Sequence, residues 1–290
     1  MGIFTDFKMK DLIYAMRLRT IPLSLSGVIL GAFLAKAQGF WNSKVFFWSF
    51  WTAILFQVLS NFSNDYGDGV LKHSISKREM IKYIYLLIFL SIISSSILIS
   101  QSFDFAHFWE WLFFFLGGLV CISAAIKYTM GDNPYGYRGL GDVSVLIFFG
   151  LVPVNVTFYL YSHIFEYDLF LPATSVGLLS MAVLNLNNIR DIKSDRKNGK
   201  NTLAVRLGFI KAKIYHILIV FGAFFCSLKF ILRKKNTIYQ FIFLISFFPM
   251  AIHLKKVLLT KEEKKFDSEL KKVSLNTLIF SLLLGLGQLI

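Results

Sequence analysis

The chain of 290 residues is 56% hydrophobic, contains 32 Phe and has only 17% charged residues. This composition excludes an ordinary soluble domain and indicates a polytopic membrane protein. The formal net charge of +14 is expected to serve membrane topology and contact with anionic lipids, and not nucleic-acid binding.

Nine apolar runs follow one another along the chain, each long enough or nearly so to cross a bilayer core of roughly 30 Å as a helix of about 20 residues. They are too long for strands and lack the two-residue alternation of an outer-membrane barrel. We therefore expect an all-α bundle of nine transmembrane helices. The predicted helices lie near residues 20–37, 45–62, 83–101, 109–128, 143–162, 169–189, 213–232, 238–255 and 273–290.

The distribution of lysine and arginine predicts the orientation of this bundle. With the N-terminus in the cytoplasm, 25 of the 31 Lys and Arg residues fall in cytoplasmic segments, as the positive-inside rule requires. The run Arg233-Lys234-Lys235 is the one awkward feature of this topology. Residues 1–20 are polar and amphipathic, and we expect no cleavable signal peptide there.

Two acidic clusters lie at the predicted cytoplasmic ends of the second and sixth helices. Their members are Asn61, Asp65 and Asp68 in the first cluster, and Asn187, Asp191 and Asp195 in the second. Steps of three or four residues place side chains on one face of a helix. Each cluster is therefore predicted to present an asparagine and two carboxylates toward a common cavity.

A divalent cation is the expected occupant of this cavity. A single aspartate at a membrane boundary is often simply solvated by headgroup water. Two carboxylate clusters on one membrane face repel one another unless cations lie between them. Oxygen ligands with no cysteine or paired histidine nearby suit Mg²⁺ or Mn²⁺ and argue against zinc and copper.

Basic side chains in the predicted cytoplasmic segments point to the substrate. They are Lys127, Arg138, Arg190, Lys193, Arg196, Lys200 and Arg206. Taken alone, each is an ordinary topology determinant or headgroup contact. Because Mg²⁺ usually shares its coordination shell with substrate phosphates, metal and cations together predict a polyprenyl diphosphate, with its head at the metal and its tail among the Phe-rich helices. The metal would act as a Lewis acid on the departing diphosphate.

Several stretches resemble the UbiA-type membrane prenyltransferases. The NxxxDxxD and DxxxD pair on the second and sixth of nine helices resembles the superfamily. Other stretches resemble the branch that prenylates 1,4-dihydroxy-2-naphthoate: Met16-Arg17-Leu18-Arg19-Thr20, the run from Asn64 to Gly69, Lys127-Tyr128-Thr129, the run from Pro134 to Asp142, and the runs Asn188 to Asp191 and Gly199 to Gly208. The resemblance spans nearly the whole chain and implies one prenyltransferase domain of residues 1–290.

The resemblance implies transfer of a polyprenyl group to 1,4-dihydroxy-2-naphthoate with loss of carbon dioxide, giving demethylmenaquinone. It also implies a bacterial inner-membrane protein whose active site faces the cytoplasm under a polar cap, to which the loop after the fourth helix contributes. The implied metal-binding and catalytic residues are Asp65, Asp68, Asp191 and Asp195. The implied substrate-binding residues are Asn61, Asn64, Lys127, Tyr128, Arg138, Asp142, Asn187, Arg190 and Lys200.

Two alternatives remain open. Another UbiA-type prenyltransferase would use 4-hydroxybenzoate or haem as acceptor, because residues away from the diphosphate motifs decide the acceptor. A carboxylate-based cation transporter would use the same aspartates, although both clusters lie toward the cytoplasmic face and no inverted pair of broken helices is visible in the sequence.

Some features do not follow the family pattern or have no assigned role. Arg17-Leu18-Arg19-Thr20 stands where Arg-Pro-Arg-Thr is expected, and residues 73–76 lack the expected glycine-rich, acidic character. The five histidines are scattered and are expected to be structural or interfacial. They are His73, His107, His163, His216 and His253. Cys121 and Cys226 have no metal-ligand spacing.

Overall fold

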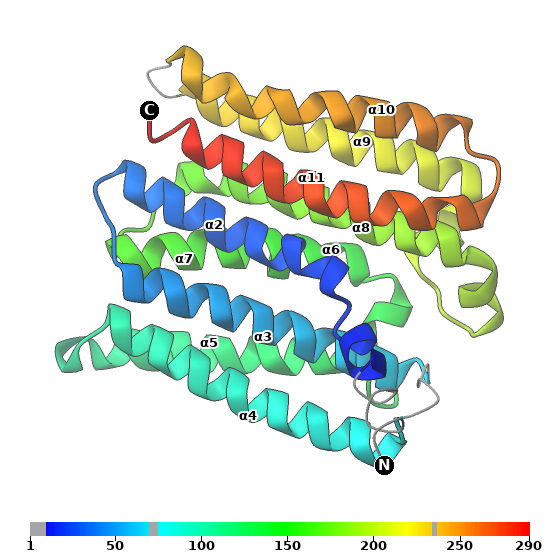
Figure 1. The fold of residues 1–290 in the computed structure, drawn as a ribbon, viewed down its shortest axis with the longest axis horizontal. Coiled ribbons are helices and arrows are strands. Elements are labelled where there is room, and N and C mark those ends of the chain that lie inside the picture. Colours follow the sequence, from blue (N-terminus) through cyan, green and yellow to red (C-terminus); the bar gives the residue numbers. More distant parts are fainter. Residues whose placement is uncertain (1–9, 70–74, 234–236) are drawn as a thin grey trace. The chain divides into compact units, whose positions relative to one another are not determined.

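The computed structural model describes residues 10–69, 75–233 and 237–290 (Figure 1). The regular elements of these residues are all helical, which confirms the predicted all-α fold. Internal contacts divide the chain into two compact units, whereas the prediction of a single domain stays a prediction. The first unit comprises Met1–Ile21 and Ser43–Gly136, and the second Pro22–Asn42 and Tyr137–Ile290.

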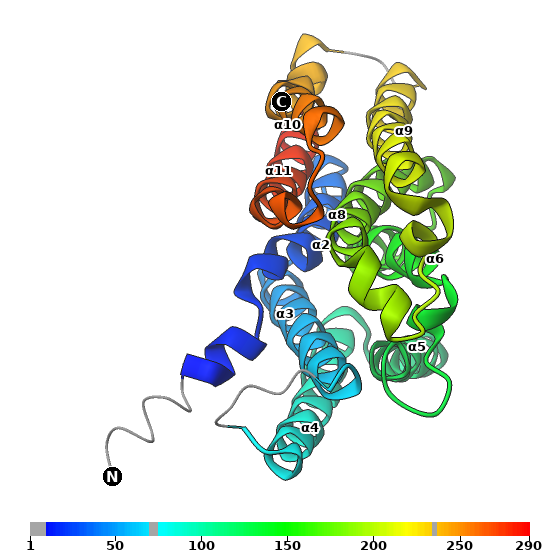
Figure 2. The ribbon, with the colours of Figure 1, turned by 90° about the vertical axis from the view of Figure 1, so that its right-hand side faces the viewer.

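The first unit is built around three helices that pack on one another, α3 (Ser43–Gly67), α4 (Lys77–Ser102) and α5 (Phe108–Lys127). Their neighbouring positions can be followed in Figures 1 and 2. Two short 3₁₀ turns accompany them, η1 (Leu18–Thr20) before α2 and η2 (Phe105–His107) before α5. Asn61 and Asp65 of the first acidic cluster lie in the last turns of α3, and Asp68 lies in the turn that follows it.

The second unit is centred on α8 (Phe170–Lys197), which contacts α9 (Leu203–Arg233), α11 (Asp267–Leu286) and the segment η4 (Leu146–Leu151). The second acidic cluster lies at the C-terminal end of α8. The elements that lie wholly or mostly in this unit are α2 (Ile21–Ala37), α6 (Gly141–Val145), η4 (Leu146–Leu151), α7 (Val152–Ser162), η5 (Tyr167–Leu169), α8 (Phe170–Lys197), α9 (Leu203–Arg233), η6 (Ile238–Ser246), α10 (Phe247–Leu259), η7 (Glu263–Phe266) and α11 (Asp267–Leu286). The 3₁₀ turn η3 (Tyr135–Arg138) is divided between the two units.

Within the described ranges, eight helical segments are long and apolar enough to cross a membrane. The last predicted helix, α11, is long enough but carries Glu269, Lys271 and Lys272 near its start. Acidic residues such as Asp267 and Glu269 in the first turn favour the helix N-terminus, so α11 begins earlier than the predicted residue 273. The chain is a multi-pass membrane protein, and its long helices agree with the nine predicted.

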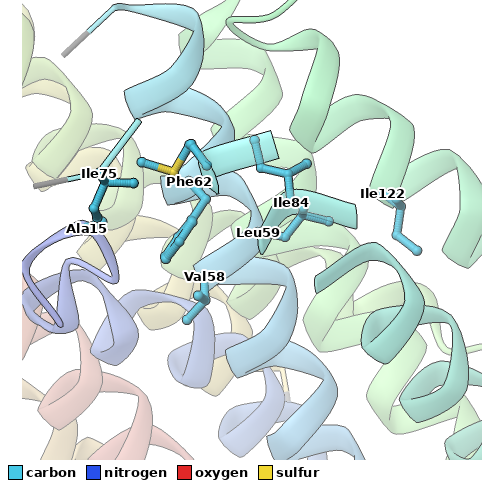
Figure 3. Packing of buried hydrophobic residues seen from close by; sticks show 8 residues of the cluster. Ala15, Val58, Leu59, Phe62, Ile75, Ile84 and Ile122 are labelled. Carbon is cyan, nitrogen blue, oxygen red and sulfur yellow. The ribbon is translucent and has the colours of Figure 1, made fainter. Parts of the chain in front are cut away.

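A cluster of buried apolar side chains holds the end of α3 in place within the first unit (Figure 3). Phe62 lies three residues before Asp65 and makes an edge contact with Tyr83 of α4, with ring centroids 6.2 Å apart. In an apolar surrounding such packing stabilises mainly through van der Waals contact. The buried members are Ala15, Val58, Leu59, Phe62, Ile75, Met80, Ile84 and Ile122.

Capping explains two helix ends that the apolar runs alone place wrongly. Helix α4 begins at Lys77 and not near residue 83, because Ser76 and Glu79 form a capping box that satisfies backbone N–H groups. Helix α8 continues to Lys197, past the predicted end at residue 189. The chain leaves α8 through Gly199 in the left-handed region, at φ 71°. The second acidic cluster is therefore helical throughout.

Three predicted helices are less regular than expected. The helix predicted at 143–162 contains the π-helical segment η4, because Pro153 has no N–H to donate to the preceding turn. The helix predicted at 238–255 begins as the 3₁₀ segment η6, and α10 starts just before Pro249, a position at which a missing N–H is tolerated. Helix α9 begins at Leu203, ten residues before the predicted start at residue 213. Its helical backbone is interrupted at Gly208.

The π-helical segment η4 approaches α8 very closely at two glycines. A Cβ added to Gly150 would lie 2.5 Å from both the Ala173 carbonyl oxygen and the Gly177 Cα. Backbone atoms on a packed helix cannot move aside as a flexible side chain can. This contact therefore requires glycine at position 150.

Replacement of Gly150 by alanine is expected to destabilise the protein by about 1–3 kcal/mol, the usual cost of overpacking a core. Thermal unfolding of the purified protein in detergent measures this change. Gly117→Ala is the matched control, because nothing lies within 4 Å of a Cβ built at that helical glycine. The control should melt at or above the wild-type temperature. Equal melting temperatures for Gly150→Ala and wild type would contradict this account of the contact.

Candidate functional site: two acidic motifs on α3 and α8

The first motif centres on Asp65, which is 3% exposed. The guanidinium of Arg17 donates a hydrogen bond to Asp65 Oδ1 and forms an ion pair with it. Arg17 adopts the left-handed conformation, with φ 46° and ψ 54°, which costs a residue other than glycine about 1–2 kcal/mol. The neutralised carboxylate offsets this cost, because a buried charge without a partner is far less favourable.

Asn61 connects the same motif to the segment before α2. Its Nδ2 donates to the Met16 carbonyl at 2.8 Å and to Thr20 Oγ1 at 3.1 Å. The Thr20 hydroxyl in turn donates to the Arg17 carbonyl at 2.9 Å. In this structure Asn61 therefore positions the Arg17 turn, a role that the sequence analysis did not assign to it.

The other residues of the first motif contact the end of α5. The Thr129 hydroxyl lies 3.1 Å from Asn64 Oδ1 and 3.0 Å from the Ser63 carbonyl. Tyr128 packs edge to face against Tyr135, with ring centroids 5.4 Å apart. Asp68 is half-buried in the turn that follows α3, and its N–H donates to the Asn64 carbonyl at 2.8 Å. Lys127 is exposed at the last residue of α5.

The second motif is organised by Arg190. Its guanidinium binds Asp191 through two hydrogen bonds, Nε to Oδ1 at 2.9 Å and Nη2 to Oδ2 at 2.6 Å. It also donates to Asn187 Oδ1 at 2.7 Å and to Asp267 Oδ1 of α11 at 2.6 Å. One arginine thus neutralises a motif carboxylate and connects α8 to α11.

Asp195 lies one turn further along α8 and is 8% exposed. The Lys200 ammonium is 3.9 Å from Asp195 Oδ1, and the Lys200 N–H donates to the Asp195 carbonyl at 2.9 Å. The same ammonium lies 4.7 Å from the centre of the Tyr137 ring, in a cation–π contact. The turn after α8 therefore places the Lys200 ammonium beside Asp195 of the second motif.

The loop before α6 is fastened to the segment that follows α8. The Asn201 N–H donates to the Tyr137 carbonyl at 2.7 Å, and Arg206 Nη2 donates to the Arg138 carbonyl at 2.5 Å. Asp142 is buried and accepts a hydrogen bond of 3.0 Å from the Tyr215 hydroxyl. The structure thus brings the predicted residues Arg138, Asp142 and Lys200 into one part of the second unit.

The donor atoms of both motifs fit a hard divalent cation. The motif side chains offer carboxylate and amide oxygens, which Mg²⁺ and Mn²⁺ prefer. Asp65, Asp191 and Asp195 each face a basic side chain, as expected of carboxylates that need a positive partner. No group of three or more His, Cys, Asp or Glu side chains placed to hold a metal occurs within either unit of the described chain.

One acidic motif lies in each compact unit. The predicted residues Asn61, Asn64, Asp65, Asp68, Lys127 and Tyr128 belong to the first unit, and Arg138, Asp142, Asn187, Arg190, Asp191, Asp195 and Lys200 to the second. Direct contacts join Asn187, Arg190 and Asp191 to one another and Asp195 to Lys200. The shared cavity of the two motifs stays a prediction.

The structure also pairs two histidines that the sequence analysis treated as scattered. His216 of α9 and His253 of α10 are buried, with their Nε2 atoms 2.9 Å apart. His253 Nδ1 is hydrogen-bonded to Glu269 of α11 at 2.8 Å, and Lys256 and Lys272 bind the same carboxylate. Residues 37 positions apart share no periodic signal, so sequence spacing could not reveal this pair. His73 lies outside the described residues.

Comparison with known proteins places the chain in a family. Two curated relatives, both 1,4-dihydroxy-2-naphthoate octaprenyltransferases, are 40% identical (Haemophilus influenzae, 94% of each chain) and 37% identical (Escherichia coli, 94% of this chain and 93% of the relative). A UbiA homolog from Archaeoglobus fulgidus, solved bound to Cd²⁺, has the same fold with a TM-score of 0.56 at 13% identity, covering 93% of this chain and 99% of that chain. The model of the UbiA prenyltransferase family matches residues 24–278. The chain therefore belongs to the UbiA prenyltransferase family.

Proposed function

We propose that the chain transfers a polyprenyl group from a polyprenyl diphosphate to 1,4-dihydroxy-2-naphthoate with loss of carbon dioxide, giving the reduced (quinol) form of demethylmenaquinone. The observation that carries this proposal is the similarity over 94% of the chain to two relatives that are named for this acceptor. Similarity of this extent covers both diphosphate motifs and the segments that lie outside them. It therefore favours the naphthoate over 4-hydroxybenzoate or haem.

The proposed reaction balances without a dedicated protein base. The bond between the allylic carbon and the diphosphate oxygen breaks, and the electron-rich ring forms a new carbon–carbon bond to that carbon. The bond between the ring and its carboxylate then breaks, and its electron pair restores the aromatic ring as carbon dioxide leaves. These steps assign no role to the buried pair of His216 on α9 and His253 on α10.

The four motif carboxylates would hold the metal ions. These are Asp65, Asp68, Asp191 and Asp195. Bound Mg²⁺, or Mn²⁺ in its place, supplies Lewis-acid stabilisation of the departing diphosphate. The oxygen-only donor set and the cationic partner of three of these carboxylates support this assignment.

Basic side chains beside the motifs would bind the diphosphate oxygens. Arg17, Arg190 and Lys200 neutralise motif carboxylates in this structure. With the carboxylates engaged by a divalent cation, the same side chains would be available to pair with phosphate oxygens, which guanidinium groups bind in a bidentate manner. Lys127 and Arg138 would act from the polar cap.

We propose further that residues 1–290 work as one domain in a bacterial inner membrane, with both motifs toward the cytoplasm. The family match from residue 24 to residue 278 runs through both compact units, which supports the single domain. The excess of Lys and Arg in the segments next to both motifs supports the cytoplasmic side.

Membranes that contain the protein should prenylate 1,4-dihydroxy-2-naphthoate only when Mg²⁺ is present. The assay supplies an allylic polyprenyl diphosphate with either the naphthoate or 4-hydroxybenzoate, with Mg²⁺ or with EDTA, and identifies the product by mass. The expected product has gained the prenyl group and lost carbon dioxide. Preferential prenylation of 4-hydroxybenzoate would overturn the proposed acceptor. Uptake of cations into liposomes without any prenyl transfer would instead support the transporter alternative.

Asp65→Asn and Asp191→Asn should each lower turnover by about a hundredfold or more. Metal-based charge stabilisation is worth several kcal/mol, and each 1.36 kcal/mol is a factor of about ten in rate. Both variants should also bind Mn²⁺ more weakly in electron paramagnetic resonance titrations while eluting as folded protein. Asp168→Asn is the matched control, because it breaks an ion pair with Arg233 outside both motifs. Wild-type turnover in either motif variant would remove that aspartate from the proposed site.

A further inference from the structure

Gln57 extends the first motif by one helical turn toward the middle of α3. It lies four residues before Asn61 and eight before Asp65, so the three side chains follow one face of the helix. Eight helical residues span about 12 Å. Gln57 is 6% exposed. It is thus a buried amide within the apolar part of the helix that carries the motif.

The hydrogen bonds around Asn61 determine which way the Gln57 amide points. Asn61 Nδ2 donates to the Met16 carbonyl and to Thr20 Oγ1, so Asn61 Oδ1 must face the other side. A backbone carbonyl can only accept a hydrogen bond, which fixes this orientation of the Asn61 amide. Gln57 Nε2 donates to Asn61 Oδ1 at 3.1 Å. The Gln57 Oε1 atom is therefore the free end of the amide.

Gln57 Oε1 is buried and has no hydrogen-bond partner among the described residues. Leaving a buried carbonyl oxygen unsatisfied is unfavourable, and more so in apolar surroundings. Rotating the Gln57 amide would set its oxygen against Asn61 Oδ1, so the amide keeps this orientation. The oxygen is thus prepared for a donor that arrives with a ligand.

The two proposed substrates differ in their ability to supply that donor. A polyprenyl diphosphate consists of ionised phosphate oxygens and a hydrocarbon chain, and neither part donates a hydrogen bond. A dihydroxyaromatic acceptor carries two phenolic O–H groups, which do. We propose that Gln57 is an acceptor-binding residue whose Oε1 accepts a hydrogen bond from a ring hydroxyl of the aromatic substrate. This inference rests on the proposed function.

The test compares ligands that differ in a single hydroxyl. Binding of 1,4-dihydroxy-2-naphthoate and of its two monomethyl ethers to the full chain in lipid nanodiscs is followed by tryptophan fluorescence. Wild type should bind one of the ethers about tenfold more weakly than the parent compound, the effect of a buried oxygen left unpaired. Gln57→Met should bind the parent and that ether equally. In turnover, KM for the naphthoate should rise about tenfold while KM for the polyprenyl diphosphate stays unchanged.

Two further variants make the result specific. Gln57→Asn keeps the side-chain carbonyl but shortens its reach by one methylene. It should likewise bind the parent naphthoate and the monomethyl ether with similar affinity. This variant keeps the test valid if Gln57→Met does not fold. Ser91→Ala removes a hydroxyl on α4 that is also buried and without a partner among the described residues. This control should retain the wild-type preference for the hydroxyl ligand.

Retention of the wild-type preference in Gln57→Met or Gln57→Asn would overturn the inference, since Oε1 would then serve a buried water or nothing at all. Equal affinity of wild type for the parent and both ethers would overturn it as well. Failure of the proposed function has a different signature, because wild type would then not prenylate the naphthoate. The same comparison with 4-hydroxybenzoate and its methyl ether would still decide the role of Gln57.

Discussion

Carboxylates at the ends of apolar helices have to be neutralised, and much of the local structure around both motifs follows from this constraint. A buried charge without a partner is unfavourable by several kcal/mol. Asp65 receives its partner from Arg17, 48 residues earlier in the chain, and Asp191 from its neighbour Arg190. The two solutions differ because a side chain on the same helix can reach a carboxylate that is partly exposed, whereas the nearly fully buried Asp65 is reached from another segment.

These neutralising contacts also determine the backbone around each motif. The pairing of Arg17 with Asp65 requires a left-handed residue, which Asn61 supports by binding the carbonyl of Met16. Arg190 connects α8 to α11 because its second ion pair is with Asp267. In each unit, therefore, the residues that would bind a metal diphosphate also hold separate segments together. Substitutions there affect local structure and charge at the same time.

The sequence predicts the helices well because long apolar runs report directly on the bilayer. It predicts their ends less well, since these depend on local chemistry such as the Ser76 capping box and the left-handed Gly199. The π-helical segment η4 and the 3₁₀ segment η6 were not predicted, although a proline follows each of them in the sequence. Pro153 follows η4, and Pro249 follows η6. Hydropathy averages over a window and cannot register a single missing N–H group.

Within the candidate site, the sequence identifies the charged motif residues by type and spacing. Their partners were not predictable, because the contact between Arg17 and Asp65 depends on how the chain turns before α2. Gln57 is also invisible to sequence analysis. A glutamine one turn before a motif has no distinctive pattern until the orientation of Asn61 shows which of its atoms lacks a partner.

The contact between Arg17 and Asp65 has a consequence for biosynthesis. Arg17 leaves the ribosome 48 residues before its partner, so the segment before α2 cannot reach its final conformation until most of α3 has been made. The positive charge of Arg17 remains at the membrane surface during this interval, where it resists translocation. On the topology proposed above, the same arginine would favour the cytoplasmic side during synthesis and afterwards complete the first motif.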